Sequence, residues 1–451
     1  MFFIYDSIKT SIVELQNKGR KLEILSKLTG LFGIIVLLGI CFLMSNNKKK
    51  INLKTVSVGL LLQFLLAVFI LKTPLGAKIF GFLAGVINKI LEASIAGSNF
   101  VFGWLTNSPD KISELFPHKD FIFALILMST MILILVIVNI LYYYGIMQRV
   151  ILFLGKIMNK VMGVSGAEAL SNCASPFVGN VAAQSMIKHY LPNLTRSELL
   201  ASMTGSTACI SASCIAMYTG FGINTEYILA ASVMAIPGSF VVSKIVYPEV
   251  GEPETKKDFK ISRRRTDVNL LAAISKGASE GMRVSINVIA VLLALVALIT
   301  FCNEILARFG LFLFNTCHLD LSSIGIDMQN LSIQMLVGKV FSIFAGLIGA
   351  TWGNIEAVGT LIGEKLILNE TIAYIDLANH MEAATLSAKS IMVATFACCG
   401  FANLSTIAIQ IGGIGELAPN QRKNLARLGV KALICGTLVS YISAAIAGLL
   451  F

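Results

Sequence analysis

Polar side chains with helical spacing occur in an apolar segment near the C-terminus. The segment covers residues 400–419, and no charged residue occurs within 390–415. Asn403, Thr406 and Gln410 are spaced so that three hydrogen-bonding groups share one helical face. Lipid cannot satisfy such groups, so this face must contact protein, water or a bound solute. Taken alone, the stripe favours hydrogen bonding between helices over a solute site.

A carboxylate occurs in a second apolar segment, where Glu370 lies within LNETIAYIDL (368–377). A charge at the bilayer centre costs about 2.5–3.5 kcal/mol on insertion scales, so it is usually functional or paired. Glu370 is therefore either an acceptor for solute hydroxyls or an ion-pair partner of Lys365. Three further polar residues would complete a site for a polyol such as a ribose: Asn369, Asn403 and Thr406.

The composition places these residues in a membrane protein. The chain has 451 residues, of which 56% are hydrophobic and 14% charged, against about 25% charged in soluble proteins. The net charge of +11 comes from basic residues clustered between apolar runs, which indicates loop orientation rather than nucleic-acid binding. None of the nine cysteines forms a C-x-x-C pair, and no zinc, Ser-His-Asp or P-loop signature occurs. We therefore expect no enzyme, no cofactor and no ATP hydrolysis.

Hydropathy predicts an all-α polytopic protein with eight transmembrane helices and two re-entrant helical hairpins. The predicted spans are 28–45, 55–71, 121–148, 199–218, 227–246, 284–303, 390–415 and 432–450. Segments 150–197 and 339–377 are moderately apolar but interrupted by glycine or proline, which favours hairpins buried in protein. Segment 72–120 has mixed charge and three prolines, so we expect interfacial pieces rather than a crossing.

Loop charge gives an orientation for these elements. Loops 46–54, 249–269 and 416–431 are basic, whereas loop 304–330 has one basic residue and three acids. If both hairpins return to their own side, all three basic loops face the cytoplasm. This arrangement places both termini outside. The predicted surface segment 1–27 has a mild basic excess that goes against it.

The two interrupted segments also resemble each other. The first contains Ala167-Glu168-Ala169-Leu170 and the second Ile355-Glu356-Ala357-Val358, and each is followed by a span with small polar residues. Paired broken segments in two halves of a chain are a sequence pointer to a transporter binding site.

Motifs along the chain resemble those of the concentrative nucleoside transporter family, which are cation-coupled nucleoside symporters. The resemblance begins near residue 55 and includes LLQFLLAVFILKTPLG, ILYYYGIMQ, SELLASMTGS, LNETIAY and GFANLSTIAIQIGGIGELAP. It implies a homotrimer in the lipid bilayer of the cell (inner) membrane, with inverted repeats and an elevator-type transport domain inside a scaffold. The predicted divisions are a surface segment 1–27, scaffold helices 28–149, a first repeat 150–248, a cytoplasmic loop 249–269, a scaffold span and outer loop 270–330, and a second repeat 331–451.

The resemblance assigns the ribose side of a nucleoside site. The family's binding Glu of the second hairpin matches Glu370, and its Phe, Asn and Ser on the next span match Phe401, Asn403 and Thr406. The exchange of Ser for Thr keeps the hydroxyl group.

The base side departs from the family pattern. The family's Gly-Gln-(Thr/Ser)-Glu tip is matched by Gly179, Asn180, Val181 and Ala182, so a hydroxyl and a carboxylate are missing. An apolar site discriminates weakly between polar groups. We expect altered or relaxed base choice. The alternatives are a different nucleoside-like solute or a receptor-like protein that does not transport.

The coupling-ion residues that the resemblance implies also differ. The matching positions are Ser175, Val178, Cys209 and Ile210. A cysteine sulfur is a poor ligand for a hard cation such as Na+, although backbone carbonyls could still serve. Ser in place of the usual Asn also resembles proton-coupled permeases. We therefore expect H+ rather than Na+, with Glu370 as the first candidate for proton carrier and Glu168 as the second.

Overall fold

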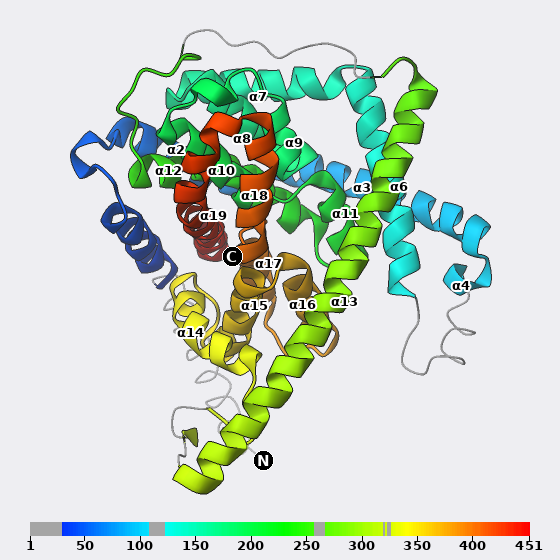
Figure 1. Ribbon diagram of the computed structural model, residues 1–451, viewed down its shortest axis with the longest axis vertical. Helices are drawn as coiled ribbons and strands as arrows, with labels where there is room; N and C mark the ends of the chain where they lie inside the picture. Colours follow the sequence, from blue (N-terminus) through cyan, green and yellow to red (C-terminus); the bar gives the residue numbers. More distant parts are fainter. Residues whose placement is uncertain (1–28, 108–121, 257–266, 319–320, 323–325) are drawn as a thin grey trace, which may run out of the picture.

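The computed structural model of the chain is built from helices (Figure 1). It describes residues 29–107, 122–256, 267–318, 321–322 and 326–451, and every regular element in these ranges is helical. Seven of the described helices are long and apolar enough to cross a membrane, as a polytopic membrane protein requires. The predicted surface segment 1–27 lies outside the described residues.

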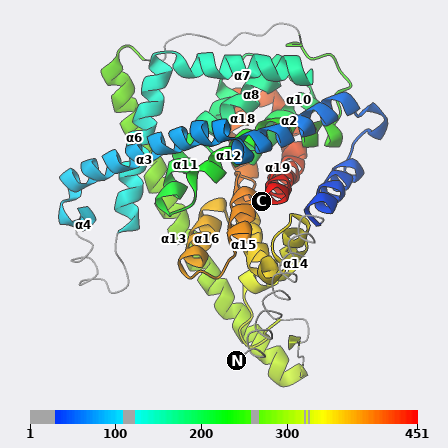
Figure 2. The same ribbon diagram turned by 180° about the vertical axis from the view of Figure 1, so that it is seen from behind.

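Twelve helices form two sets with the same order of elements. Each set has a leading helix, two short hairpin helices, a helix broken into two pieces and a long helix. The first set is α7 (Ile146–Met162), α8 (Gly166–Val178), α9 (Asn180–Ser185), α10 (Arg196–Ala208), α11 (Ala212–Gly220) and α12 (Thr225–Val246). The second set is α14 (Ile333–Leu347), α15 (Ile355–Ile367), α16 (Glu370–Glu382), α17 (Ala388–Cys398), α18 (Leu404–Leu417) and α19 (Arg422–Leu450). Figures 1 and 2 place α8 and α9 near one end of the molecule and α15 and α16 toward the other.

Among the residues that the structure describes, six further helices lie outside these two sets. They are Thr29–Leu43, α2 (Leu53–Lys72), α3 (Pro74–Phe102), α4 (Trp104–Asn107), α6 (Phe123–Tyr143) and α13 (Leu270–Cys317). Short 3-10 turns occur at Lys48–Lys50, Leu191–Asn193, Trp352–Asn354 and Pro419–Gln421.

The helices α6 and α13 pack closely at two glycines. A Cβ at Gly277 would lie 2.6 Å from the Cα of Val136, and one at Gly281 would lie 2.5 Å from the Cα of Ile132. The two backbones can approach this closely because glycine has no Cβ. The α13 helix then runs diagonally past the two sets in Figure 1.

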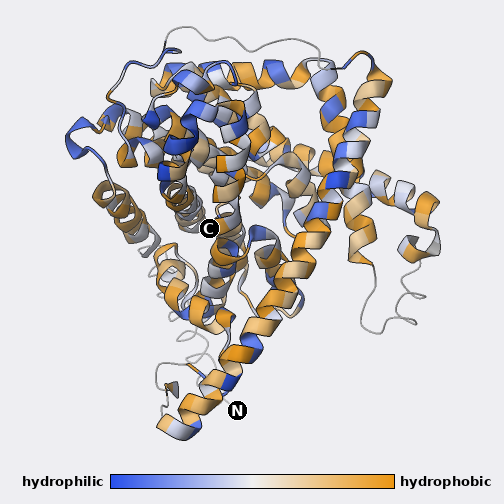
Figure 3. Cartoon of the chain, viewed as in Figure 1, coloured by the Kyte–Doolittle hydropathy of each residue, from blue (hydrophilic) through white to orange (hydrophobic). Residues whose placement is uncertain are grey.

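The repeated sets form the interior, and the outer helices lie on its periphery. In α12, 89% of the membrane-length apolar window is buried within the chain, whereas in α3 and α13 the figure is 17%. The lower half of α13 presents apolar residues along its length (Figure 3). Because the described part of the chain leaves most of this helix unburied, its apolar surface suits contact with lipid or another protein.

Several predicted boundaries were wrong. The predicted span 284–303 is part of the 48-residue helix α13, because helix-forming residues continue on both sides of the apolar centre. Within segment 72–120, where we expected several pieces, residues Pro74–Phe102 form the single 29-residue helix α3. Its Pro74 stands in the first turn of the helix, where proline is tolerated.

Two predicted spans are broken in the middle. Segment 199–218 divides into α10 and α11, and segment 390–415 divides into α17 and α18. Hydropathy did not show either break, because the residues at the breaks are small or apolar. The predicted hairpins 150–197 and 339–377 began too early, because α7 and α14 are separate helices. The hairpin helices occupy 166–185 and 355–382, so the second hairpin also ends later than predicted.

Candidate functional site

Glu370 lies at the start of a helix. It is the first residue of α16, and the Asn369 side chain caps this helix by accepting a hydrogen bond from the Ile372 N–H at 3.0 Å. Helix N-termini favour a negative charge, because their N–H groups carry partial positive charge. The sequence therefore places a carboxylate where the backbone stabilises it. The Asn369 oxygen is engaged as the cap.

The Glu370 carboxylate is buried and held on both oxygens. Its Oε1 accepts a hydrogen bond from the Tyr218 hydroxyl at 3.1 Å, and its Oε2 accepts one from the Asn403 Nδ2 at 3.0 Å. Only 6% of the residue is exposed. A carboxylate has about four acceptor positions, so two remain for hydroxyl donors of a solute. The hypothesis of a polar site at Glu370 and Asn403 thus has a geometric basis.

Asn403 is the N-cap of α18 rather than a residue on the face of a continuous helix. Its Oδ1 accepts hydrogen bonds from the backbone N–H of Thr406 at 3.0 Å, from the Thr406 hydroxyl at 2.9 Å and from the Ser405 hydroxyl at 2.7 Å. These contacts orient the amide so that its nitrogen donates to Glu370. Phe401 lies beside them in the break and is half-buried.

Tyr218 is a member of this cluster that the sequence did not reveal. It lies in α11, is fully buried, and its hydroxyl is also 3.2 Å from the Thr371 Oγ1. Its ring centroid is 4.4 Å from that of Tyr374. Tyr218 therefore connects the first set of helices to the second hairpin. A buried tyrosine usually hydrogen-bonds through its hydroxyl. A tyrosine in an apolar segment is therefore a candidate partner for a buried polar group, and Tyr218 could have been selected on this ground.

The tip of the first hairpin lies against α18. Gly179 joins α8 to α9 with a φ of +83°, which favours glycine. The Asn180 Oδ1 accepts a hydrogen bond from the Gln410 Nε2 at 3.1 Å, and the same nitrogen donates to the Met203 carbonyl at 3.0 Å. Val181 packs against Gly413. A Cβ added at Gly413 would lie only 2.6 Å from the Cγ2 of Val181.

Gln410, predicted as part of the polar stripe, thus bridges the hairpin tip and α10. Its Oε1 is buried and has no hydrogen-bond partner within the described chain. An unpaired buried acceptor costs free energy. At the tip itself, Ala182 is exposed.

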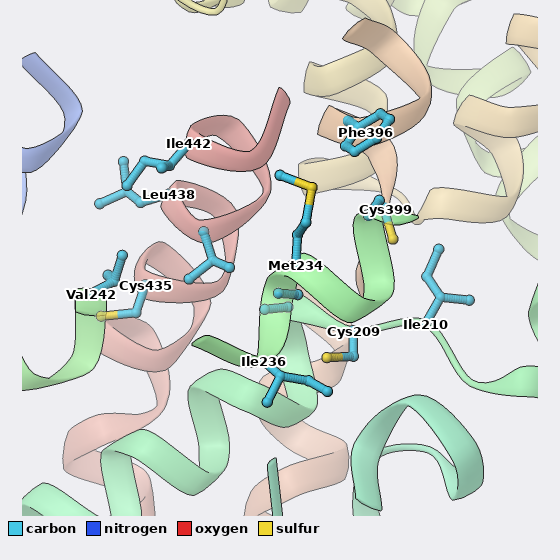
Figure 4. Close-up of a cluster of buried hydrophobic side chains, with 14 of the residues drawn as sticks. Cys209, Ile210, Met234, Ile236, Val242, Phe396, Cys399, Cys435, Leu438 and Ile442 are labelled. Atoms are coloured by element: carbon cyan, nitrogen blue, oxygen red, sulfur yellow. The ribbon is translucent and has the colours of Figure 1, made fainter. Parts of the chain in front are cut away.

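The predicted coupling-ion residues lie at two places, the end of α8 and the break after α10. The Ser175 hydroxyl donates to the Ser171 carbonyl at 2.9 Å and lies 3.4 Å from the Ser206 Oγ. Val178 is the last residue of α8. Cys209 and Ile210 follow α10 and are buried among apolar side chains (Figure 4).

The predicted coupling-ion residues and the tip of the first hairpin are linked through Ser206. The Ser206 hydroxyl lies 3.4 Å from the Asn180 carbonyl oxygen and 3.4 Å from the Ser175 Oγ. The Cys209 thiol donates to the Ser232 carbonyl at 3.7 Å. Ser206 therefore connects Ser175 to Asn180 at the hairpin tip, and the Cys209 sulfur already has a partner.

The two broken helices cross at their breaks. A Cβ at Gly400 would lie 2.8 Å from both the Thr207 and Ala208 carbonyl oxygens, and Gly400 has a φ of +117°. Only glycine fits such a position without strain. The breaks of the two sets thus meet in one region, where backbone carbonyls of α10 are free of intrahelical partners.

Two charged residues discussed from the sequence have other partners. Lys365, the alternative partner of Glu370, is buried with its Nζ 3.5 Å from the Ala397 carbonyl oxygen. Glu168, the second candidate for proton carrier, is buried with its Oε2 2.7 Å from the Lys244 Nζ and its Oε1 accepting from the Ser165 N–H. It lies in the first turn of α8, at the opposite end from the hairpin tip.

Paired helical hairpins, paired broken helices and polar groups at the breaks define the architecture of a secondary transporter. Family models agree with this class: residues 32–105 and 227–448 match the N- and C-terminal models of the Na+ dependent nucleoside transporters, and residues 124–225 match a nucleoside recognition model.

Relatives and solved structures match nearly the whole chain. An uncharacterized transporter of Haemophilus influenzae is 38% identical and the nucleoside permease NupC of Helicobacter pylori is 33% identical; each match covers 94% of this chain and 98% of the relative. The structure of CNTnw in an inward-facing substrate-bound state is 35% identical, with a TM-score of 0.86 and coverage of 94% of this chain and 97% of that one. The chain belongs to the concentrative nucleoside transporter family, whose members are transporters rather than enzymes.

Proposed function

We propose that the chain is a cation-coupled nucleoside symporter that takes up its substrate by an elevator mechanism. The observation that supports this most directly is the Glu370 carboxylate, which is buried at a helix N-terminus and oriented by Tyr218 and Asn403. A buried carboxylate with free acceptor positions suits the vicinal hydroxyls of a ribose. Asn369, Phe401 and Thr406 would complete the sugar side of the site.

The base would lie toward the first hairpin, beside Asn180, Val181 and Ala182. Of these three side chains only Asn180 offers hydrogen-bonding groups, and its oxygen already accepts from Gln410. The Asn180 amide nitrogen then remains as a donor. Such a pocket would contact bases mainly through apolar groups, so we propose that base choice is altered or relaxed.

A coupling Na+ would bind near Ser175, Val178, Cys209 and Ile210. These residues lie at the C-terminal ends of two helices, where carbonyl oxygens carry partial negative charge. The sulfur of Cys209 is a poor ligand for Na+, so we favour H+, with Glu370 as the proton carrier. Substrate and cation would then share one mobile body that contains both hairpins, re-entrant from opposite sides, within a homotrimer in the inner membrane.

Gradient-driven uptake tests the proposal. The purified chain is reconstituted in vesicles, and uptake of labelled uridine and adenosine is measured under an imposed inward pH gradient, an imposed Na+ gradient, or neither. We expect one gradient to accelerate uptake of at least one nucleoside. If neither gradient accelerates any nucleoside, the symporter proposal is wrong.

A variant of Glu370 separates transport from a receptor-like role. Glu370→Gln removes the charge and leaves the shape, so a transporter should lose most of its uptake, by at least about tenfold for the loss of a charged hydrogen-bond acceptor. The matched control is Glu382→Gln at the other, exposed end of the same helix, which should keep wild-type uptake. A receptor-like protein would take up no nucleoside in either form.

A further inference from the structure

Each hairpin is bonded to the broken helix of its own set by the fifth residue of its second helix. This residue is Gln184 in α9 and Tyr374 in α16, and both side chains are fully buried. The Gln184 Nε2 donates to the carbonyl oxygen of Ser202 in α10 at 3.2 Å. The Tyr374 hydroxyl donates to the carbonyl oxygen of Thr395 in α17 at 2.8 Å. Two side chains of different chemistry thus make the same kind of contact in the two hairpins.

Gln184 uses both ends of its amide group. Its Oε1 accepts a hydrogen bond from the Ser202 hydroxyl at 2.6 Å, and its Nε2 also donates to the Ser206 Oγ at 2.8 Å. The Ser206 hydroxyl in turn lies 3.4 Å from the carbonyl oxygen of Asn180, the first residue of α9. Helix α9 has only six residues and no side-chain N-cap. So short a helix is marginal by itself, so its direction depends on contacts such as those of Gln184.

Tyr374 is held at its hydroxyl and at its ring. Thr395 is one of the last four residues of α17, whose carbonyl groups have no partner within the helix, and the Tyr374 hydroxyl satisfies one of them. The Tyr374 ring centroid lies 4.4 Å from that of Tyr218, whose hydroxyl donates to the Glu370 Oε1 at 3.1 Å. Tyr374 is thereby connected through Tyr218 to Glu370, the first residue of α16.

The first and fifth residues of a helix lie on one face, a single turn apart. A contact that fixes the fifth residue therefore also fixes the direction of the first. In the two hairpins the first residues are Asn180 and Glu370. These two residues would face the nucleobase and the ribose of the substrate, respectively.

We propose that Gln184 and Tyr374 are positioning residues, which we call the hairpin anchors. Gln184 holds Asn180 toward the nucleobase, and Tyr374 holds Glu370 toward the ribose hydroxyls. The inference rests on the proposed function and adds to it that the choice of base and the choice of sugar depend on separate anchors. A residue that served only for packing would, when changed, weaken the binding of every nucleoside by a similar factor.

Two substitutions test the anchors by opposite effects on affinity. Gln184→Met keeps the length of the side chain and removes the amide, and Tyr374→Phe removes one hydroxyl. Binding of labelled uridine to the purified protein in detergent is competed with adenosine or with 2′,3′-dideoxyuridine. We expect Gln184→Met to change the ratio of uridine to adenosine affinity by about fivefold, the loss of one hydrogen bond, with the ratio of uridine to dideoxyuridine affinity within about twofold of wild type. We expect Tyr374→Phe to lower the second ratio by about fivefold and to leave the first within about twofold.

The matched control is Tyr441→Phe in α19, because the buried Tyr441 hydroxyl has no hydrogen-bond partner among the described residues. This variant should keep both affinity ratios. If Gln184→Met does not fold, Gln184→Asn, which keeps a buried amide but shortens its reach, should shift the uridine to adenosine ratio instead. A test variant that changes both ratios by the same factor, or neither ratio, would overturn its assignment as an anchor.

Hydrogen exchange tests the anchors without a nucleoside. Gln184→Met should speed amide exchange in α9 by at least about threefold and leave α16 unchanged, because a lost contact lowers the free energy of local opening. Tyr374→Phe should do the reverse. Exchange in both hairpins as slow as in Tyr441→Phe would show that neither side chain holds its tip.

The two measurements also separate this inference from the symport proposal. If the variants show the crossed pattern of affinities but no gradient accelerates uptake by the wild type, the symport proposal fails and the anchors stand. If the wild type binds no nucleoside, the roles of Gln184 and Tyr374 in positioning a substrate are wrong, whatever the exchange rates show.

Discussion

At the scale of single residues, the Tyr218 hydroxyl is the donor that fixes one oxygen of the Glu370 carboxylate. We predict that Tyr218→Phe raises the KM for uridine about tenfold with a smaller effect on the maximal rate, because a hydrogen bond to a charged group contributes about 1.5–3 kcal/mol. The measurement is the initial rate of uridine uptake over a range of concentrations. Tyr227→Phe, in α12, is a control in the neighbouring long helix.

A structural role for Tyr218 would give a different pattern. If the tyrosine orients the carboxylate toward sugar hydroxyls, Tyr218→Phe should also reduce the preference for uridine over 2′,3′-dideoxyuridine, since the analogue lacks the hydroxyls that the carboxylate accepts. An unchanged preference, together with reduced protein yield, would assign Tyr218 to packing alone.

The tip of the first hairpin, which would contact the nucleobase, allows a gain-of-selectivity experiment. Changing Val181→Thr and Ala182→Glu together restores the hydroxyl and carboxylate of the related family tip. We predict that the ratio of uridine to adenosine uptake changes by about tenfold or more, because a polar site rejects bases that leave its groups unpaired. Competition between the two labelled nucleosides measures this ratio. Equal ratios in the wild type and the double variant would show that the tip does not contact the base.

Residue types at the site were partly readable from the sequence. An acid and an amide in apolar segments predicted that Glu370 and Asn403 would meet, because lipid cannot satisfy either group, and the structure brings them to 3.0 Å. The sequence did not show that Asn403 caps a helix, or that Tyr218 reaches the same carboxylate. Both facts depend on where α11 and α18 begin, which hydropathy does not reveal.

At the scale of elements, the crossing of the two broken helices depends on Gly400. We predict that Gly400→Ala destabilises the folded protein by about 1–3 kcal/mol or more, because its φ of +117° and the 2.8 Å approach to two carbonyl oxygens both exclude a Cβ. The Tm in detergent and the rate of uptake measure the effect. Gly412→Ala in α18 is the matched control, since a Cβ there meets nothing within 4 Å. A Gly400→Ala protein as stable as this control would contradict the crossing.

The breaks themselves show why element boundaries were hard to predict. Segment 390–415 reads as one uncharged, membrane-length run, yet α17 ends at Cys398 and α18 begins at Leu404. Asparagine is common at helix N-caps and glycine at helix breaks, but we predicted neither role for Asn403 or Gly400. Such signals are individually weak, because glycine and asparagine also occur inside membrane helices. The matching break after α10 has no glycine at all, so only the repeat relates the two.

At the scale of the whole molecule, the internal repeat was recognisable because two interrupted segments with similar short motifs occur in corresponding positions. The structure extends this likeness from the hairpins to six elements in each set. Packing between the sets was not predictable, because contacts such as that between Tyr218 and Glu370 join residues far apart in the chain. The outer helices were easier to predict from hydropathy than the contacts between the two sets. For example, α13 is an apolar helix with few buried residues.

Orientation in the membrane is a whole-molecule property that a natural cysteine can test. Cys317 is an exposed free thiol at the end of α13, next to the loop that the charge distribution places outside. We predict that a membrane-impermeant maleimide added to intact cells labels the wild-type chain, and that Cys317→Ser abolishes this labelling because most of the other thiols are buried. In the Cys317→Ser background, Lys256→Cys, at the edge of the basic loop, should react only after the membrane is permeabilised, because basic loops stay in the cytoplasm. Labelling of Lys256→Cys in intact cells would reverse the orientation. It would also place the first hairpin, which begins beside this loop through the Thr255 contact with Ala167, at the outer face.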